Sequence, residues 1–493
     1  MTSLQEMARD ILARRTEGRA VWFEGSWHGW DEVGALARTV MSLVEASGAA
    51  LRTPVLVITR NRPSAFAALL GLIAAGRSVR FLYPFQSAAA IAREVERLKP
   101  AVVVAAEQDF AEEVCAAIRA HAAAAVALSE MAARSLPGLE RSTVPLDPEA
   151  PAQPMLEIQT SGTTGPPKRF PMSHEMALNR FVLPAAQMAK GKDGSPPPPM
   201  LLYMSMGNLS GMMSSLPALM HGMEMIVYDR FSLDGWRDYV RTYRPALSGL
   251  QPAAIQMLMD ADVPREELAG LRYLTVGSAP LRPELQRAFE ARYGVSVLLA
   301  YGATEFYGTV ASMTPALLDQ WGDAKFGSVG LPLPGMHIRT VDAESDAALP
   351  PGEEGLLQVR CEAIGPDWIR TSDLAVIDAD GFLFLRGRAD GAIVRGGFKL
   401  LPETIERGLL QHEAVAAAAV VGVADKRLGQ VPGAAIRFKP DVEPPDAKEL
   451  EAHLRQKVLA THIPVHWRFV DTMPLTPSMK IDRGAVARLF EDA

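Results

Sequence analysis

The chain has 493 residues, too many for one ordinary hydrophobic core, so two or more domains are expected. Hydrophobic residues make up 48% of it and charged residues 22%, a composition typical of a folded globular protein and not of a disordered one. The formal net charge of −7 argues against a nucleic-acid partner, because phosphate backbones require clustered, excess lysine and arginine.

The N-terminal stretch "MTSLQEMARDILARR" predicts an amphipathic helix with charges of both signs. It lacks the basic start and the apolar run of a signal peptide, and no segment approaches the roughly eighteen apolar residues of a membrane span. Cys115 and Cys361 are too few for a disulfide framework or a zinc site. We therefore expect a cytoplasmic protein with reduced thiols and no membrane span.

Short β-rich runs alternate with helical stretches along most of the chain, and such a pattern is typical of parallel sheets covered on both faces. Near residue 387 the pattern changes. We therefore predict an α/β fold with a large N-terminal domain (1–389), built of sheets layered with helices, and a small α+β C-terminal domain (390–493). In chain order, strands are expected at 53–60, 101–107, 154–158, 225–229, 271–277 and 295–302, and helices at 64–76, 110–125 and 283–294.

The stretch "QTSGTTGPPKRF" (159–170) follows an expected strand, where open α/β sheets tend to place ligands. Its glycines permit close backbone approach, and its hydroxyl and N–H groups can surround an anion while a lysine supplies a point charge. The sequence is not a nucleotide P-loop, because Pro167 precedes the lysine and Arg169 follows it. It predicts a phosphate cradle, with a solvated surface loop as the alternative. The cradle residues are Thr160, Ser161, Gly162, Thr163, Thr164, Gly165 and Lys168.

Four later segments are weak signals individually, since Asp373 could simply form a turn and Lys480 could be a solvated chain end. They are "YGATE" (301–305), "RTSDL" (370–374), "GRADGAIVRGGFKLLPETIE" (387–406) and "PLTPSMKIDR" (474–483). Between the second and third, "AVIDADGFLFLRGR" predicts a hairpin with an Asp-Gly turn. In this order and spacing, and with the loop at 159–170, the segments resemble the adenylate-forming superfamily. That superfamily contains acyl- and aryl-CoA synthetases, stand-alone adenylation domains and luciferase, and the resemblance covers essentially the whole chain.

The resemblance implies activation of a carboxylic acid by ATP, giving acyl-AMP and pyrophosphate, followed by transfer of the acyl group to a thiol. A mobile C-terminal domain would serve the two half-reactions in turn. Thr304 would contact the α-phosphate, Glu305 would ligate Mg²⁺, and Lys480 would act during adenylation. Tyr301 would stack beside adenine, and Asp373 would accept the ribose hydroxyls.

The same resemblance assigns the remaining site residues, and the loop 160–168 would hold the β- and γ-phosphates. Gly302, Ser278 and Ala279 would lie beside the nucleotide, Arg388 near ribose and phosphates, Asp390 at the hinge, Gly396, Gly397 and Lys399 at the thiol tunnel, and Gly277, Asn208 and Gly211 in the acyl pocket. The chain departs from the superfamily at Arg169, Ser372 and Met479, where glycine is usual. None of these departures removes a catalytic group.

The acyl pocket is the least readable part of the site. Asn208 in "GNLSG" (207–211) stands where the superfamily usually has an aromatic residue or histidine. Eight of the 22 methionines lie within residues 200–225, which indicates either a pliable apolar pocket or ordinary core packing.

The leading hypothesis is an acyl- or aryl-CoA ligase that uses ATP, Mg²⁺ and CoA. The alternatives are an adenylation enzyme that loads the phosphopantetheine of a carrier protein, and a catalytically silent nucleotide-binding protein.

Overall fold

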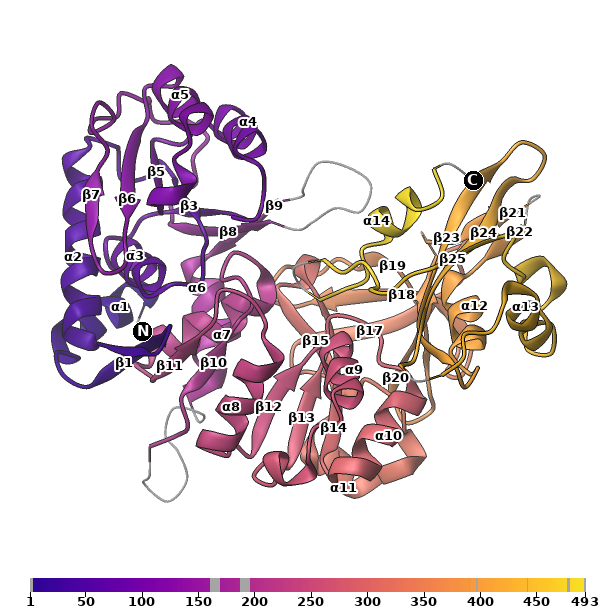
Figure 1. The fold of residues 1–493 in the computed structure, drawn as a ribbon. Coiled ribbons are helices and arrows are strands. Elements are labelled where there is room, and N and C mark those ends of the chain that lie inside the picture. The colour runs from indigo at the N-terminus through magenta and orange to yellow at the C-terminus, as the bar shows by residue number, and fades with distance from the viewer. Residues whose placement is uncertain are drawn as a thin grey trace. The chain divides into compact units, whose positions relative to one another are not determined.

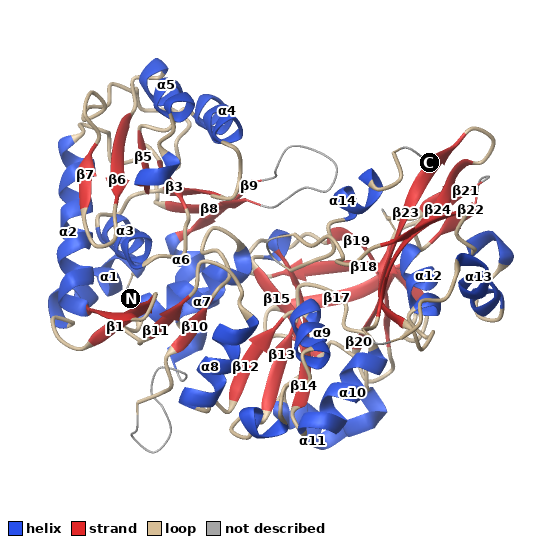
Figure 2. Ribbon diagram, in the orientation of Figure 1, coloured by secondary structure: helices blue, strands red, loops and turns tan. Residues whose placement is uncertain are grey.

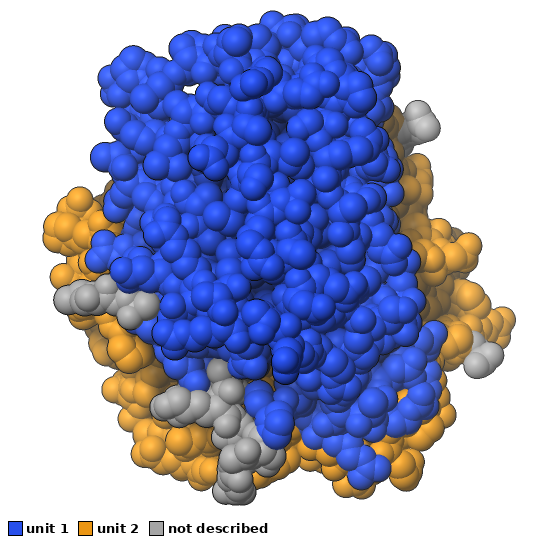
Figure 3. All heavy atoms as spheres, turned by 90° about the vertical axis from the view of Figure 1, so that its left-hand side faces the viewer, with its two compact units in different colours: residues 1–245 blue, residues 246–493 orange. Residues whose placement is uncertain are grey.

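The computed structural model describes residues 3–159, 169–186, 196–389, 391–395, 398–440, 442–476 and 479–491. The chain divides into two compact units, residues 1–245 and residues 246–493 (Figure 3). The division expected after residue 389 stays a prediction, and its hinge residue Asp390 lies outside the described residues.

The larger sheet of residues 1–245 has the strand order β7-β6-β5-β3-β4-β8-β9 (Figures 1 and 2). The strands from β6 to β8 are parallel, and β7 and β9 add an antiparallel strand at each edge. Strand β8 ends and β9 begins on either side of the predicted phosphate loop. The bounds are β3 (Val55–Ile58), β4 (Val79–Leu82), β5 (Val102–Ala106), β6 (Ala124–Leu128), β7 (Ala133–Ser135), β8 (Met155–Gln159) and β9 (Arg169–Ser173).

A second sheet in the same unit has the order β10-β11-β1-β2. Between the two sheets lies α3 (Pro63–Ala74), which is buried at every residue and contacts β5 and β1. Its uniformly apolar sequence is explained by this position. The other elements are β1 (Arg19–Phe23), β2 (Ser26–Gly29), β10 (Met200–Leu202), β11 (Met225–Val227), α1 (Leu4–Arg14), α2 (Trp30–Ala46), α4 (Ala88–Leu98), α5 (Glu112–Ala120), α6 (His174–Ala177), α7 (Leu209–Met220) and α8 (Leu233–Tyr243).

Residues 246–493 begin with a five-stranded sheet of order β12-β13-β14-β15-β16, followed by an antiparallel sheet β17-β18-β19-β20. The long strand β14 is parallel to β13 and antiparallel to β15, so the sheet changes from parallel to antiparallel pairing at the strand that carries most of "YGATE". The elements are β12 (Leu247–Leu250), β13 (Tyr273–Val276), β14 (Ser296–Ala303), β15 (Gly308–Ser312), β16 (Leu331–Pro332), β17 (Met336–Val341), β18 (Glu354–Cys361), β19 (Ile369–Ile377), β20 (Leu383–Arg388), α9 (Pro252–Asp260), α10 (Pro283–Tyr293) and α11 (Pro315–Trp321).

The C-terminal part of this unit has its own sheet, in which β24 pairs with β21, β23 and β25. Its separate apolar core includes Ile405, Val420, Ile436 and Leu450. The elements are β21 (Ile393–Arg395), β22 (Phe398–Leu400), β23 (Val415–Asp425), β24 (Gly429–Phe438), β25 (His466–Phe469), α12 (Pro402–Leu409), α13 (Ala447–Arg455) and α14 (Arg483–Arg488).

The predicted α/β class is confirmed, and so are the main local predictions. The strands and helices expected from the sequence appear, mostly with their ends displaced by a few residues. The helix expected at 110–125 is wrong at its C-terminal end, because it stops at Ala120 and Ala124 begins the buried strand β6. Burial in the sheet overrides the helix propensity of the alanine run there. The predicted hairpin joins β19 to β20 through Asp380 and Gly381. Gly381 has a φ of +84°, a conformation that glycine adopts at little cost because it has no side chain. In the part of the chain that the structure describes, no helix combines the length and the apolarity that crossing a bilayer demands.

Candidate active site

The carboxyl end of β14 places Tyr301, Thr304 and Glu305 together. After the strand, residues 304–306 form a short 3₁₀ turn that ends at Tyr307 in the left-handed conformation, with φ of +49°. At Gly302 a Cβ atom would lie 2.4 Å from the Gly308 carbonyl oxygen, so only glycine allows β15 to return this closely. Gly302 therefore shapes the backbone under the site.

Tyr301 and Asp373 are joined by a short hydrogen bond. The Tyr301 hydroxyl, on a residue that is 9% exposed, donates to Asp373 Oδ2 at 2.5 Å. Burial and the neighbouring Asp373 carboxylate raise the pKa of Tyr301, so the phenol remains a proton donor at neutral pH. The sequence predicted these two residues at the nucleotide, and the structure brings them together across 72 positions of chain.

Arg388 flanks the same carboxylate from the neighbouring strand. Asp373 and Arg388 are register partners in the β19–β20 pair, and Arg388 Nη1 lies 3.6 Å from Asp373 Oδ1. Arg388 Nη2 also donates to the Ser372 hydroxyl at 2.6 Å. The glycine that is usual at position 372 could not accept this bond, and Ser372 does not have a positive φ. The serine therefore adds a contact without backbone strain.

Lys480 lies on a tight turn of the C-terminal part. Its carbonyl oxygen accepts from the Thr476 N–H at 2.7 Å, and its own N–H donates to the Thr476 hydroxyl at 3.1 Å. Lys480 is solvent-exposed, yet the protein around its ammonium group displaces enough water to lower its pKa. The positive charge of Arg388 adds to this lowering and Glu305 opposes it. Lys480 therefore lies within electrostatic reach of both Arg388 and Glu305.

Met479, beside this lysine, has a φ of +60°. A non-glycine residue in this region carries strain of about 1–2 kcal/mol. The superfamily's usual glycine would adopt the same conformation freely, so the turn keeps its geometry at the expense of stability.

The segment that follows β13 also has unusual backbone geometry. Ser278 has a φ of +70°. At Gly277 a Cβ atom would lie 3.2 Å from the Ala300 carbonyl oxygen on β14, so a larger residue would press on that strand. Backbone strain of this kind is concentrated at functional sites. Gly277, Ser278 and Ala279 stay predicted neighbours of the nucleotide and the acyl group.

Asn208 begins helix α7 in the other unit. Its Oδ1 accepts from the Gly211 N–H at 2.8 Å, which makes Asn208 the N-cap of the helix. At Gly211 a Cβ atom would lie 1.9 Å from the Ser205 carbonyl oxygen, so this glycine is fixed by packing. An asparagine directly before a helical run is the sequence signal that identifies this N-cap. The cap uses only the Asn208 Oδ1 atom, and a role of its amide NH₂ in the acyl pocket stays a prediction.

The methionine cluster around α7 is mainly core. Five of its eight members are buried and the other three are half-buried. This burial favours the packing interpretation over a pocket lined by methionine. The buried methionines are Met206, Met212, Met220, Met223 and Met225.

Several predicted site residues lie outside the described residues: Thr160, Ser161, Gly162, Thr163, Thr164, Gly165, Lys168, Asp390, Gly396 and Gly397. Of Lys399 only the backbone, in β22, is described.

Arg169, which stands where glycine is usual, makes two ion pairs. Its Nη1 lies 2.9 Å from Glu157 Oε1 and its Nη2 3.3 Å from Glu94 Oε2. Arg80 and Arg97 complete the cluster. The charge that replaces the usual glycine is therefore matched by carboxylates of β8 and α4.

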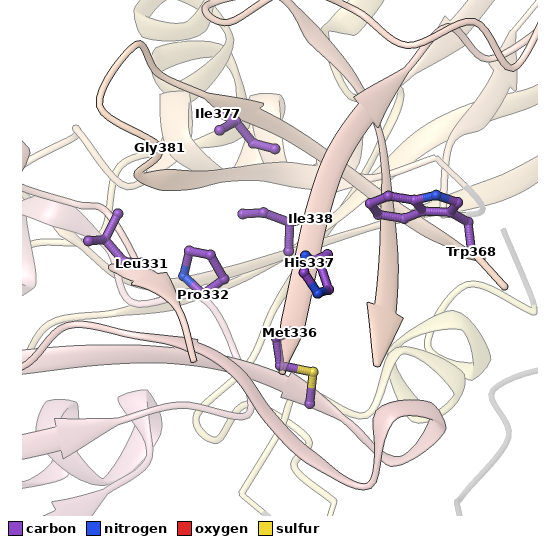
Figure 4. A pocket seen from close by; sticks show the side chains of 8 residues that line it. All are labelled: Leu331, Pro332, Met336, His337, Ile338, Trp368, Ile377 and Gly381. Carbon is purple, nitrogen blue, oxygen red and sulfur yellow. The ribbon is translucent and has the colours of Figure 1, made fainter. Parts of the chain in front are cut away.

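A pocket of about 490 Å³ in the second unit contains none of the predicted site residues. It is lined by Leu331, Pro332, Met336, His337, Ile338, Trp368, Ile377 and Gly381 (Figure 4). Most of these side chains are apolar, and the pocket contributes no group to the chemistry of the site.

Residues 9–366 match the family of AMP-binding enzymes, and residues 404–480 match the AMP-binding enzyme C-terminal domain. The chain belongs to the AMP-binding enzyme family, which confirms the resemblance inferred from the five segments. The two matches also confirm that a large N-terminal domain is followed by a separate C-terminal domain.

Among its relatives is the sulfoacetate–CoA ligase of Cupriavidus necator, 31% identical over 71% of this chain and 70% of that protein. The 4-coumarate–CoA ligase-like 9 protein of Oryza sativa subsp. japonica is 28% identical over 84% of this chain and 79% of that protein's length. The ATP-bound MatB of Rhodopseudomonas palustris has the same fold, with a TM-score of 0.81 and 22% identity over 100% of this chain and 99% of that one.

Proposed function

We propose that this protein is an AMP-forming acid–CoA ligase. It converts a carboxylic acid and ATP to acyl-AMP and pyrophosphate, and it then transfers the acyl group to the thiol of CoA. The observation that carries the proposal is the arrangement of charge around β14. Tyr301 donates to the Asp373 carboxylate, and Arg388 and Glu305 lie close enough to Lys480 to influence the pKa of its ammonium group.

The first half-reaction brings one anion against another, so its barrier falls when positive charge is fixed around the α-phosphate. In the proposal, Asp373 binds the ribose hydroxyls of ATP, and the Tyr301 ring lies beside adenine. Arg388 and Lys480 then supply charge at the phosphates. The ammonium of Lys480 is costly to keep charged in the free enzyme, as its lowered pKa indicates, and bound phosphate would offset that cost.

The residues present fit a metal ion that arrives with ATP. Glu305 is exposed, and the described residues contain no group of three or more histidine, cysteine or acidic side chains placed to hold a metal. Mg²⁺ typically needs only one or two carboxylates, with phosphate oxygens and water as its other ligands. Glu305 would hold it, and the ion would neutralise phosphate charge when bound. Thr304 would contact the α-phosphate.

The thiol step rests on the residues that follow the proposed boundary at 389/390. Asp390 would act as hinge, and Gly396, Gly397 and Lys399 would line the route of the thiol. Free CoA is the proposed acceptor, with a carrier-protein phosphopantetheine as its competitor in the test below. We also propose a cytoplasmic location, which both cysteines support because each is free.

The proposal is tested by measuring pyrophosphate release over a panel of aliphatic, aromatic and sulfonated carboxylic acids, with and without CoA. At least one acid should release pyrophosphate slowly without CoA and turn over repeatedly with it, yielding a thioester. Turnover with a phosphopantetheine carrier but not with CoA would move the acceptor to the carrier. No release with any acid, together with tight ATP binding, would favour the silent nucleotide-binding protein.

A further inference from the structure

A partly buried ion cluster lies three residues beyond Lys480, with the side chain of its arginine, Arg483, 36% exposed. Arg483 Nη1 donates to Glu406 Oε1 at 2.9 Å, and Nη2 donates to Glu406 Oε2 and to Glu403 Oε1, each at 3.3 Å. The side chain of Glu406 is 11% exposed and that of Glu403 20%. The arginine fork therefore joins the C-terminal segment to two successive turns of α12.

The same cluster completes the edge of the C-terminal sheet. Among the described strands, β23 pairs only with β24, which leaves its other edge without a ladder partner. There the Val420 N–H donates to Glu406 Oε1 at 2.8 Å, and the Val420 carbonyl accepts from Arg483 Nη1 at 2.6 Å. One ion pair thus satisfies both backbone groups of a buried residue. Arg483 is held by charge, by hydrogen bonds and by the sheet.

The ion cluster of Arg483, Glu403 and Glu406 is connected to Lys480 by a short stretch of hydrogen-bonded backbone. Leu475 bridges to Ile481, and the Asp482 N–H donates to the Pro474 carbonyl at 3.0 Å. Asp482 then caps the helix that Arg483 begins. The chain has little freedom between the lysine and the arginine, so a shift of Arg483 is passed to Lys480.

The other end of the cluster lies against the strand that carries Arg388. Glu403 Oε2 is buried and finds no hydrogen-bond partner among the described residues. It lies 3.2 Å from the place a Cβ atom would occupy at Gly387, the residue before Arg388. The cluster therefore extends from the lysine turn to the strand that holds the second cation of the site.

We propose that Arg483 is a positioning residue for adenylation, which sets the place of the Lys480 ammonium through Glu406, Glu403 and the backbone of Val420. The inference rests on the proposed function, since it requires Lys480 to act on the α-phosphate. Preorganised charge loses its effect when it is displaced, and a shift of about 1 Å at a reacting centre can cost about a hundredfold in rate.

The test is Arg483→Lys, assayed separately for acyl-AMP formation and for thioester formation from supplied acyl-AMP. Lysine keeps the charge but cannot span Glu406, Glu403 and the Val420 carbonyl together. We expect adenylation to slow roughly tenfold to a hundredfold, with the KM for ATP and the thiol step nearly unchanged. Arg468→Lys is the matched control. Arg468 lies in the same domain and donates to the Leu489 carbonyl at 2.9 Å, so its variant should leave both steps intact.

A double-variant cycle separates positioning from a general loss of structure. If Arg483 acts through Lys480, then adding Arg483→Lys to Lys480→Ala should slow adenylation little further. Fully additive losses, or equal losses in the two half-reactions, would overturn the inference. If Arg483→Lys does not fold, Glu403→Gln replaces it. This variant should slow adenylation alone by a few-fold, and an unchanged adenylation rate would contradict the inference. Wild-type adenylation by Lys480→Ala would refute the role of Lys480 on which this inference rests, whereas absence of acyl-AMP formation by the wild-type protein with every acid would overturn the proposed function.

Discussion

Replacing Tyr301 by phenylalanine isolates the hydrogen bond on which the nucleotide site is built. Tyr301 is 9% exposed and the Asp373 side chain 18%, so little water can replace the lost hydroxyl. A hydrogen bond to a charged group contributes about 1.5–3 kcal/mol, and the substitution keeps the ring. We expect residues 246–493 to lose about that much stability, with a fall in melting temperature of about 2–4 °C for each kcal/mol in a unit of this size.

The catalytic assay for Tyr301→Phe is the ATP dependence of pyrophosphate exchange. Without the phenol, the Asp373 carboxylate must be oriented when ribose binds, and each 1.4 kcal/mol so lost corresponds to about a tenfold rise in the KM for ATP. The rate constant should change little, because the hydroxyl bonds to Asp373 and not to the phosphates.

Tyr293→Phe is the matched control for this prediction. Tyr293 is 4% exposed and donates to the Val263 carbonyl, a neutral acceptor, at 3.0 Å. It should lose only about 0.5–1.5 kcal/mol and leave the KM for ATP unchanged. Equal losses of stability in the two variants, with the KM unchanged in both, would refute the reasoning.

Three further predictions concern other parts of the chain. Asn208→Ala should destabilise the protein by about 1 kcal/mol through loss of the α7 cap, whereas Asn208→Ser should keep the cap. If the Asn208 amide also hydrogen-bonds a polar group on the acid, the wild type should prefer an oxygenated acid to a purely alkyl one, because a buried amide without a partner is costly. Both variants should lose that preference, and equal kcat/KM for such a pair in the wild type would contradict the pocket role. Because the pKa of Lys480 is lowered in the free enzyme, kcat/KM for adenylation should decline with rising pH earlier than an ordinary lysine would dictate, and Lys480→Ala should lack that decline. Burial raises the pKa of Glu94, but hydrogen bonds from Arg97 and Arg169 outweigh burial, so the pKa lies below its ordinary value. The ionised Glu94 therefore stabilises the folded protein above the ordinary carboxyl pKa, and this stabilisation is lost as the pH falls through the lower pKa of the folded state. Arg169→Gly should therefore cost on the order of 1–3 kcal/mol at neutral pH and less in acid, and a pH-independent difference in urea unfolding would contradict this.

Local signals in the sequence were sufficient for many elements of the fold. The apolar run of α3, the β-branched run of β5 and the Asp380–Gly381 turn each carry their own physical cause, so their prediction did not need the rest of the chain. The division between residues 245 and 246 depends on contacts between distant segments, and no composition change marks it. It could not be predicted from local patterns.

The site shows the same contrast. Motif resemblance was enough to single out Tyr301, Asp373, Arg388 and Lys480, but not to show how they are arranged. The bond between Tyr301 and Asp373 joins positions 72 residues apart, and its geometry depends on how two sheets pack. The positioning role inferred for Arg483 likewise depends on the edge of β23 that has no partner among the described strands, and this edge is visible only when the strand order is known. Side-chain partners of this kind leave no trace in local periodicity.

The central claim is that the acid is activated as an acyl adenylate. With the best acid of the panel, both carboxylate oxygens are labelled with heavy oxygen, and the products are analysed by mass spectrometry after thioester formation with CoA. Attack of the carboxylate on the α-phosphorus of ATP transfers one labelled oxygen to AMP, so the account predicts AMP that carries a single heavy oxygen and unlabelled pyrophosphate. Unlabelled AMP, or label in inorganic phosphate with ADP as the other product, would contradict it.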